Sequence, residues 1–142
     1  MILVSRCLLG ECCRYDGGHN LDPRVRALFL AGKAVAVCPE VLGGLPVPRE
    51  PSELRDGRVV SVTGRDVTDA FELGARRAMD VCLEHRCDLA ILKAKSPSCG
   101  KGTVHNGLFD GGLTEGDGVF ARLLLDSGIP VLTEKDDLSS VL

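Results

Sequence analysis

The sequence predicts an α/β protein: a three-layer α/β/α arrangement around an open, Rossmann-like parallel sheet of about four to five strands. Short continuous apolar segments, typical of strands buried on both faces, recur along the chain. Amphipathic helical segments separate these strands, as in β-α-β units. The 142 residues suffice for one hydrophobic core and are too few for two comfortable ones. We therefore expect a single domain over residues 1–142.

The first half of the chain begins with a predicted strand over residues 2–6 (ILVSR). A helix follows, with Asp22 as its N-cap, Pro23 in its first turn and Gly32 as its stop signal. Residues 34–38 (AVAVC) form the second strand, which Pro39 halts. Residues 41–66 show no helical period, and RDGRVVSVTG within them is compatible with a small hairpin or an extended flap.

The second half of the chain begins with an amphipathic helix from Asp66 to His85, where apolar residues recur at spacings of three and four. Residues 89–93 (LAILK) form the third strand, followed by a long glycine-rich loop. The segment DGVFARLLLDSG predicts a helix that Gly128 closes, and residues 130–134 form a fourth strand. The tail KDDLSSVL adds at most one turn of helix.

Composition and charge argue against several classes of protein. The chain is 44% hydrophobic and 26% charged, which is ordinary for a globular protein in water. Its net charge of −3 argues against a general electrostatic binder of nucleic acid, which would carry a basic excess. No apolar run approaches the roughly 20 residues of a membrane span, and the N-terminus lacks the features of a signal peptide. We therefore expect a cytoplasmic location and no membrane partner.

Seven cysteines are the most informative feature of the composition. Ligands of parallel α/β sheets bind at the carboxyl ends of the strands. Cys7 follows the first predicted strand, Cys38 closes the second, and Cys99 lies in the loop SPSCG after the third. Thiolates from three loops that meet at one rim can bind zinc or an iron–sulfur cluster. The alternative is that these cysteines are buried, inert thiols.

The remaining cysteines differ in their expected roles. Cys82 lies on the apolar face of a predicted helix and Cys87 just before a strand, so both are expected to serve packing. Cys12 is expected to be an exposed thiol. Cys13 shares the polar loop of the candidate site, which leaves its role as a ligand open.

The three histidines do not form a spaced set of metal ligands. His85 is expected at the C-terminal end of a helix, where an imidazole interacts with the helix dipole. His19 and His105 occupy glycine-rich loops at the presumed rim of the site, which leaves substrate contact open for each.

Five blocks along the chain resemble one known family: SRCLLGECCRYDGGHN, CPEVLGGLPVPREP, DVTDAFELGA, LKAKSPSCG and GLFDGGLTEGDGVFARLL. In this order, and over nearly the whole chain, they are similar to the thiouracil desulfidase (TudS) family. The resemblance implies an oxygen-sensitive 4Fe–4S cluster with one iron left open for substrate. Carried onto this sequence, it implies that Cys7, Cys38 and Cys99 bind the cluster irons and that Glu40 and Ser96 are catalytic. Family members vary at the position of Cys13, so the resemblance does not favour Cys13 as a ligand.

The activity implied by the resemblance is the non-redox desulfuration of thiolated pyrimidines, from 2- or 4-thiouracil to uracil. We expect the open iron to bind the exocyclic sulfur as a Lewis acid, while a water activated by Glu40 attacks the ring carbon. Ser96 would relay a proton or hold the ring, and Lys93 or Lys95 would offset the negative charge of the cluster. Arg6 stands where a small residue is expected and could alter the substrate entrance.

Two alternative functions remain at the level of sequence. The same chemistry could act on thiolated tRNA or thionucleosides, although the acidic net charge favours a small thiolated pyrimidine as the partner. The protein could instead be a non-catalytic cluster or zinc protein that serves as a redox sensor. The sequence does not indicate an oligomeric state.

Overall fold

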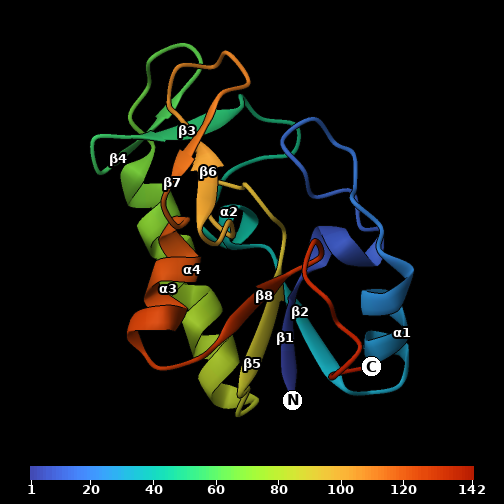
Figure 1. Ribbon diagram of the computed structural model, residues 1–142. Coiled ribbons are helices and arrows are strands. Elements are labelled where there is room, and N and C mark those ends of the chain that lie inside the picture. The colour runs from blue at the N-terminus through green and yellow to red at the C-terminus, as the bar shows by residue number, and fades with distance from the viewer.

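The computed structural model describes all 142 residues and contains one four-stranded parallel sheet in the order β2-β1-β5-β8 (Figure 1). Its strands are β1 (Ile2–Ser5), β2 (Ala34–Val37), β5 (Leu89–Leu92) and β8 (Val131–Thr133). Each neighbouring pair is parallel, so the carboxyl ends of all four strands lie at one edge. The predicted α/β fold with an open parallel sheet is confirmed, with four strands.

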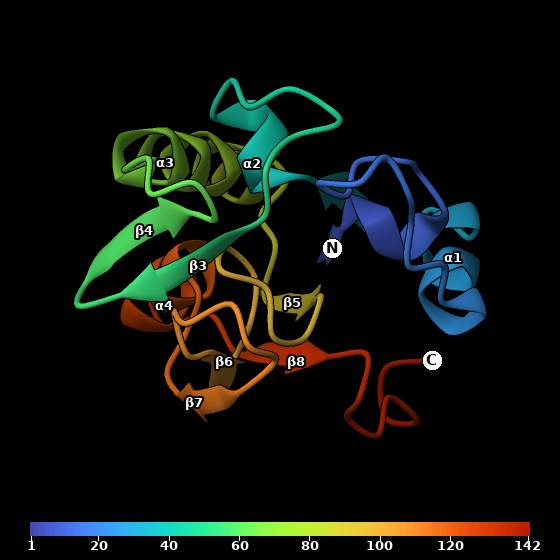
Figure 2. The ribbon, with the colours of Figure 1, turned by 90° about the horizontal axis from the view of Figure 1, so that it is seen from above.

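Helices cover both faces of this sheet, as Figure 2 shows. Helix α1 (Pro23–Leu30) and the C-terminal segment cover one face; α3 (Thr68–Glu84) and α4 (Val119–Asp126) cover the other. Successive strand residues point to opposite faces, so Leu3 joins the core under α3 and α4 while Val4 joins the core under α1. Two cores therefore explain why the strands read as continuous apolar runs.

Two antiparallel hairpins lie beyond the carboxyl edge of the sheet, at the top of the molecule in Figure 1. The first consists of β3 (Ser52–Arg55) and β4 (Arg58–Ser61), so the hairpin, and not the extended flap, is the form observed. The second consists of β6 (Thr103–His105) and β7 (Leu113–Glu115). It falls within the glycine-rich segment that the sequence predicted only as a loop.

Several predicted boundaries differ from the structure at the ends of the strands. Strand β1 ends at Ser5, because the chain turns into the 3-10 helix η1 (Arg6–Leu9). Pro39 does more than halt β2: it begins the short helix α2 (Pro39–Leu42), since proline suits the first turn of a helix. The C-terminal tail contains turns and no turn of helix. No helix is long and apolar enough to cross a membrane.

Helices α2 and α3 approach each other through a pair of glycines. A Cβ atom on Gly43 would lie 2.0 Å from the carbonyl oxygen of Ala70, and one on Gly74 would lie 1.8 Å from that of Pro39. Only residues without a Cβ allow the two backbones to come this close. This contact fixes α2 against the long helix and thereby positions the two residues at its start, Cys38 and Glu40.

Candidate active site

A cavity of about 580 Å³ opens at the carboxyl edge of the sheet, lined by residues that follow β1, β2 and β5. Because β2 lies on one side of β1 and β5 on the other, the chain connections diverge here. Such a switch point is where ligands bind in open α/β sheets. The walls include all five residues predicted for the site: Cys7, Cys38, Cys99, Glu40 and Ser96.

Each of the three predicted thiols enters the cavity from a different segment. Cys7 lies in η1 after β1, Cys38 is the N-cap residue of α2, and Cys99 lies in the loop after β5. Burial, and to a smaller extent the neighbouring Cys7 and Cys38 thiols, raises the pKa of Cys99 to about 12. No group of three or more His, Cys, Asp or Glu side chains is arranged to hold a single metal ion.

A fourth thiol, that of the buried Cys13, contacts both Cys7 and Cys38. A hydrogen bond with the Cys13 thiol is the main cause that lowers the pKa of Cys7, and the same holds for Cys38. Asn20 and Lys93 lower the pKa of Cys7 further. The pKa of Cys13 itself is raised, because losing its proton would break these two contacts. Four thiols therefore line the cavity: those of Cys7, Cys13, Cys38 and Cys99.

Ser96 shapes the loop that carries Cys99. Its Oγ accepts hydrogen bonds from the backbone N–H groups of Ser98 and Cys99, both at 3.1 Å. Gly100 closes the bend, because a Cβ atom there would lie 2.7 Å from the carbonyl oxygen of Ser96. The Gly118 N–H then donates to the Gly100 carbonyl at 2.7 Å, which joins the loop to the start of α4. The loop is thus a rigid bend that fixes the Cys99 thiol.

Ser98 connects this loop to Glu40. The hydroxyl group of Ser98 donates to Oε2 of Glu40 at 2.9 Å and lies 3.0 Å from the Oγ of Ser96. It also lies 3.6 Å from the sulfur of Cys99. A hydroxyl group has one proton, and a carboxylate is the strongest acceptor among these partners. The expected chain of hydrogen bonds therefore runs from Ser96 through Ser98 to Glu40.

Arg49 holds the other oxygen of Glu40. Its Nε lies 3.1 Å from Oε1 of Glu40, and the terminal guanidinium nitrogens donate to the backbone carbonyls of Cys13 (2.9 Å) and Pro46 (3.2 Å). The side chain of Arg49 is only 6% exposed and that of Glu40 only 15%. Glu40 therefore faces the cavity as a carboxylate whose two oxygens are both held by the protein.

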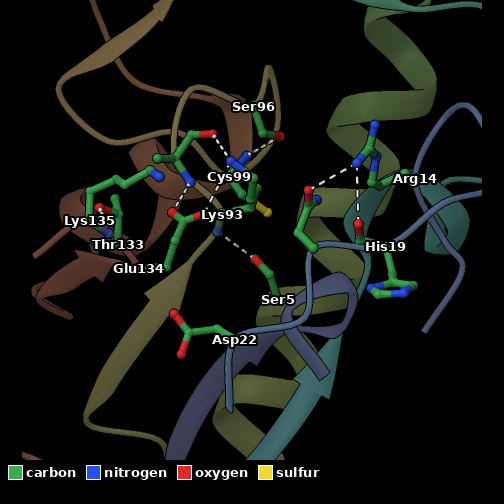
Figure 3. Close-up of polar contacts among 12 residues, drawn as sticks. Ser5, Arg14, His19, Asp22, Lys93, Ser96, Cys99, Thr133, Glu134 and Lys135 are labelled. Atoms are coloured by element: carbon green, nitrogen blue, oxygen red, sulfur yellow. Dashed lines mark hydrogen bonds and ion pairs between the residues drawn. The ribbon is translucent and has the colours of Figure 1, made fainter. Parts of the chain in front are cut away.

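On the β8 side of the cavity, Glu134 holds Lys93. The Lys93 ammonium lies 3.1 Å from Oε2 of Glu134, and the backbone N–H of Ala94 donates to Oε1 at 2.7 Å. Figure 3 shows Lys93 and Glu134 side by side. The backbone N–H of Lys93 also donates to the Ser5 hydroxyl group at 2.9 Å. These contacts clamp the ends of β1, β5 and β8 together and leave a lysine in the wall of the cavity.

The structure places the other residues singled out by the sequence as follows. Cys82 and Cys87 are buried in the core under α3, and Cys12 is exposed, as predicted. His85 ends α3, as predicted. The sequence left His19 and His105 open, and only His105 lines the main cavity. Arg6 and Lys95 also line the cavity, and Arg6 lies 3.4 Å from Glu11 across an exposed ion pair.

Comparison with known proteins decides the family. The model of the family described as 2-thiouracil desulfurase matches residues 2–136. The chain belongs to this family. "Uncharacterized protein YbbK" of Bacillus subtilis (strain 168) is 41% identical over 146 residues, which covers 96% of this chain and 97% of the relative. The solved structure of a [4Fe-4S]-dependent thiouracil desulfidase, TudS, matches with a TM-score of 0.89 and 45% identity over 94% of this chain and 89% of that one. Both the resemblance and the fold inferred from sequence are confirmed.

Two residues of the site in this desulfurase-family chain, Ser98 and Arg49, were not predicted from the sequence. Ser98 is visible in SPSCG, but only the folded loop shows that it, and not Ser96, touches Glu40. Arg49 follows Pro48 in an irregular segment with no helical or strand period. One general rule could have indicated it: a buried carboxylate needs a cationic partner. If Glu40 is buried, an arginine or lysine is therefore expected close to it.

Proposed function

We propose that the protein is an iron–sulfur-cluster-dependent desulfidase that converts thiolated pyrimidines such as 2- or 4-thiouracil to the oxygen analogue. The observation that carries this proposal is the convergence of three thiols, a held carboxylate and a hydroxyl chain on one cavity at the switch point. The family supports the substrate class, because its description is 2-thiouracil desulfurase. The similar solved protein is [4Fe-4S]-dependent by its name, which supports the cofactor.

Cys7, Cys38 and Cys99 are the residues that would hold the cluster. Thiolates are the usual ligands of iron–sulfur clusters, and each binds a different iron. The three thiols come from three segments of the chain and line one cavity, which suits a cluster whose irons each take one thiolate. When bound, a cluster with three protein ligands supplies a Lewis-acidic iron with affinity for sulfur.

The chain itself supplies the acid–base groups. Glu40 accepts a proton from the attacking water, and Arg49 and Ser98 keep its carboxylate in place while it does so. Ser98 and Ser96 provide a path along which that proton leaves the carboxylate. Overall, the carbon–sulfur bond breaks, a carbon–oxygen bond forms from water, and sulfur leaves as hydrogen sulfide with both protons of the water. No oxidant or reductant is consumed.

The test is anaerobic reconstitution of the cluster, followed by assays on free thiouracils, thionucleosides and thiolated tRNA. We expect uracil and sulfide in equal amounts from 2- or 4-thiouracil, and only with protein that contains iron. Faster turnover of thiolated tRNA or a thionucleoside would support the desulfuration reaction but show that the free base is not the preferred substrate. Fully reconstituted protein that desulfurates none of the three classes would refute the proposal and favour a redox sensor.

A further inference from the structure

The wall of the cavity formed by the hairpins carries a second set of polar groups. Glu53 on β3, His105 on β6 and Phe109 after β6 line the cavity. All three belong to the hairpins, whereas the thiols lie at the ends of strands of the parallel sheet. We call these three residues the roof. They extend over the site from the two hairpins, which Figure 1 shows beyond the carboxyl edge of the sheet.

Hydrogen bonds between the hairpins hold the roof in place. Oε1 of Glu53 accepts from the backbone N–H groups of Gly107 at 2.9 Å and Phe109 at 3.2 Å. Arg55, also on β3, donates through its guanidinium group to the carbonyl oxygen of Gly107. Both of the hydrogen bonds that the Glu53 side chain makes are to Oε1, and Oε2 has no partner within the chain. The roof therefore contains one carboxylate oxygen that is fixed in position and free to accept.

His105 supplies a donor from the same wall of the cavity. Its Nδ1 is the one buried side-chain nitrogen or oxygen atom in the molecule that has no hydrogen-bond partner. A proton on Nδ1 would form an N–H group without an acceptor, which is unfavourable in a buried position. The tautomer that avoids this cost carries its proton on Nε2, which is not among the buried unpaired atoms. Because His105 lines the cavity, its Nε2–H is a donor that the chain leaves free for a ligand.

We propose that His105 and Glu53 recognise the lactam edge of the pyrimidine, the adjacent ring N–H and C=O groups. In this arrangement Nε2–H of His105 donates to the carbonyl oxygen, and Oε2 of Glu53 accepts from the ring N–H. Both 2-thiouracil and 4-thiouracil keep such an edge beside the carbon that carries sulfur. The inference rests on the proposed function and names the feature of the substrate that the site selects.

This pairing predicts discrimination against pyrimidines that lack the carbonyl oxygen. Pyrimidine-2-thione carries the same sulfur as 2-thiouracil but has hydrogen in place of its one oxygen. The ring nitrogen beside that carbon carries no proton, so the compound leaves both the His105 donor and the Glu53 acceptor unpaired. An unpaired donor in a closed site reduces binding by on the order of 10- to 100-fold. His105 and Glu53 are therefore expected to determine specificity, whereas the reacting carbon lies with the thiols and Glu40.

The test compares 2-thiouracil with pyrimidine-2-thione in reconstituted wild-type protein and in His105→Leu. We expect KM for 2-thiouracil to rise on the order of 10- to 100-fold in His105→Leu, with kcat changed by less than about threefold. The constants for pyrimidine-2-thione, measured as a substrate or as an inhibitor, should stay the same. His105→Gln, which retains a donor, should recover part of the preference. His85→Leu, at the exposed end of α3, is the matched control and should leave KM and kcat for both compounds unchanged.

Glu53→Gln tests the acceptor without removing the anchor of the roof. The amide oxygen can still accept from Gly107 and Phe109, while its NH₂ group faces the ring N–H with a second donor. We expect weaker binding of 2-thiouracil and a reduced preference over pyrimidine-2-thione. Equal losses on both substrates, or no loss at all, in both His105→Leu and Glu53→Gln would overturn the inference.

Binding of uracil by calorimetry separates this inference from the proposed function. If reconstituted wild-type protein turns over no thiopyrimidine, the function is wrong, yet weaker uracil binding by His105→Leu still supports lactam recognition. If wild-type protein is active and uracil binds equally well to wild type and His105→Leu, the function stands and the inference fails. Protein that neither turns over a thiopyrimidine nor binds uracil refutes both.

Discussion

Glu40 is a carboxylate with both oxygens occupied, one by Arg49 and one by Ser98. We expect Glu40→Gln to lower kcat by on the order of 10²–10⁴, since an amide cannot accept the proton of water. Cluster absorbance and iron content should stay at wild-type levels because Glu40 is not expected to bind iron. Ser96→Ala and Ser98→Ala should also keep the cluster, and Ser98→Ala should cause the larger loss of kcat. A Glu40→Gln protein with wild-type turnover would remove Glu40 from the catalytic role.

The ion pair between Glu40 and Arg49 also affects stability. Arg49→Met leaves a largely buried carboxylate without its cationic partner, and we expect the free energy of unfolding to fall by about 3 kcal/mol. Urea denaturation of the cluster-free protein measures this change. In the Glu40→Gln background the same substitution should have a much smaller effect. Equal losses in both backgrounds would show that Arg49 acts through its contacts with the carbonyls of Cys13 and Pro46.

Residues of this kind mark the limit of prediction from the sequence. Cys7, Cys38 and Cys99 each lie at or after the end of an apolar strand, so the carboxyl edge of a parallel sheet was predicted to bring them together. Arg49 and Ser98 belong to the site because each contacts Glu40, which lies elsewhere in the sequence. A hydrophobic period does not predict contacts of this kind.

At the scale of elements, α2 and α3 are held together by the backbone contact at Gly43 and Gly74. Gly74→Ala would improve helix propensity by about 1 kcal/mol, but the added Cβ would lie 1.8 Å from the Pro39 carbonyl oxygen. We expect a net loss of stability of about 1–3 kcal/mol from overpacking. Activity should fall as well, because a displaced α2 moves Glu40. Thermal unfolding and turnover measure the two effects.

The control for this substitution is Arg76→Ala, an exposed position on the same helix. It should leave both unfolding temperature and turnover within error of wild type. A stabilised, fully active Gly74→Ala protein would show that the helices can separate without consequence for the site.

The elements themselves were predictable to different degrees. Helix α3 and the four parallel strands are long or strongly apolar, and their positions followed from pattern. Strands β6 and β7 have three residues each, and all of β7 is exposed, so they carry no usable period. Their hairpin depends on tertiary contacts to β3, above all those of Glu53 and Arg55 with Gly107. Helix α2 could have been predicted, because a proline after a strand is also a helix-start signal.

At the scale of the whole molecule, the seven cysteines separate into distinct groups by position. We expect serine substitution of Cys7, Cys38 or Cys99 to abolish or strongly reduce iron content after reconstitution. Cys82→Ala and Cys87→Ala should retain wild-type iron and lose stability only modestly, because these thiols lie in the core under α3. Cys13→Ser should also retain iron. Iron analysis and the visible spectrum decide each case, and loss of the cluster in Cys13→Ser would add this residue to the ligands.

The two sides of the cavity come from separate parts of the fold. Loops at the ends of parallel strands carry the thiols and the acid–base groups, and those strands form the buried core. The hairpins over the site add little to that core: of the residues in their four strands, only Val59, Ser61 and Val104 are buried. The hairpins can therefore change the preference for a ligand without altering the loops that carry the thiols and the acid–base groups. Exchanging the hairpins between two desulfurases should transfer the preference for one thiolated ring over another and leave the iron-binding half of each enzyme untouched.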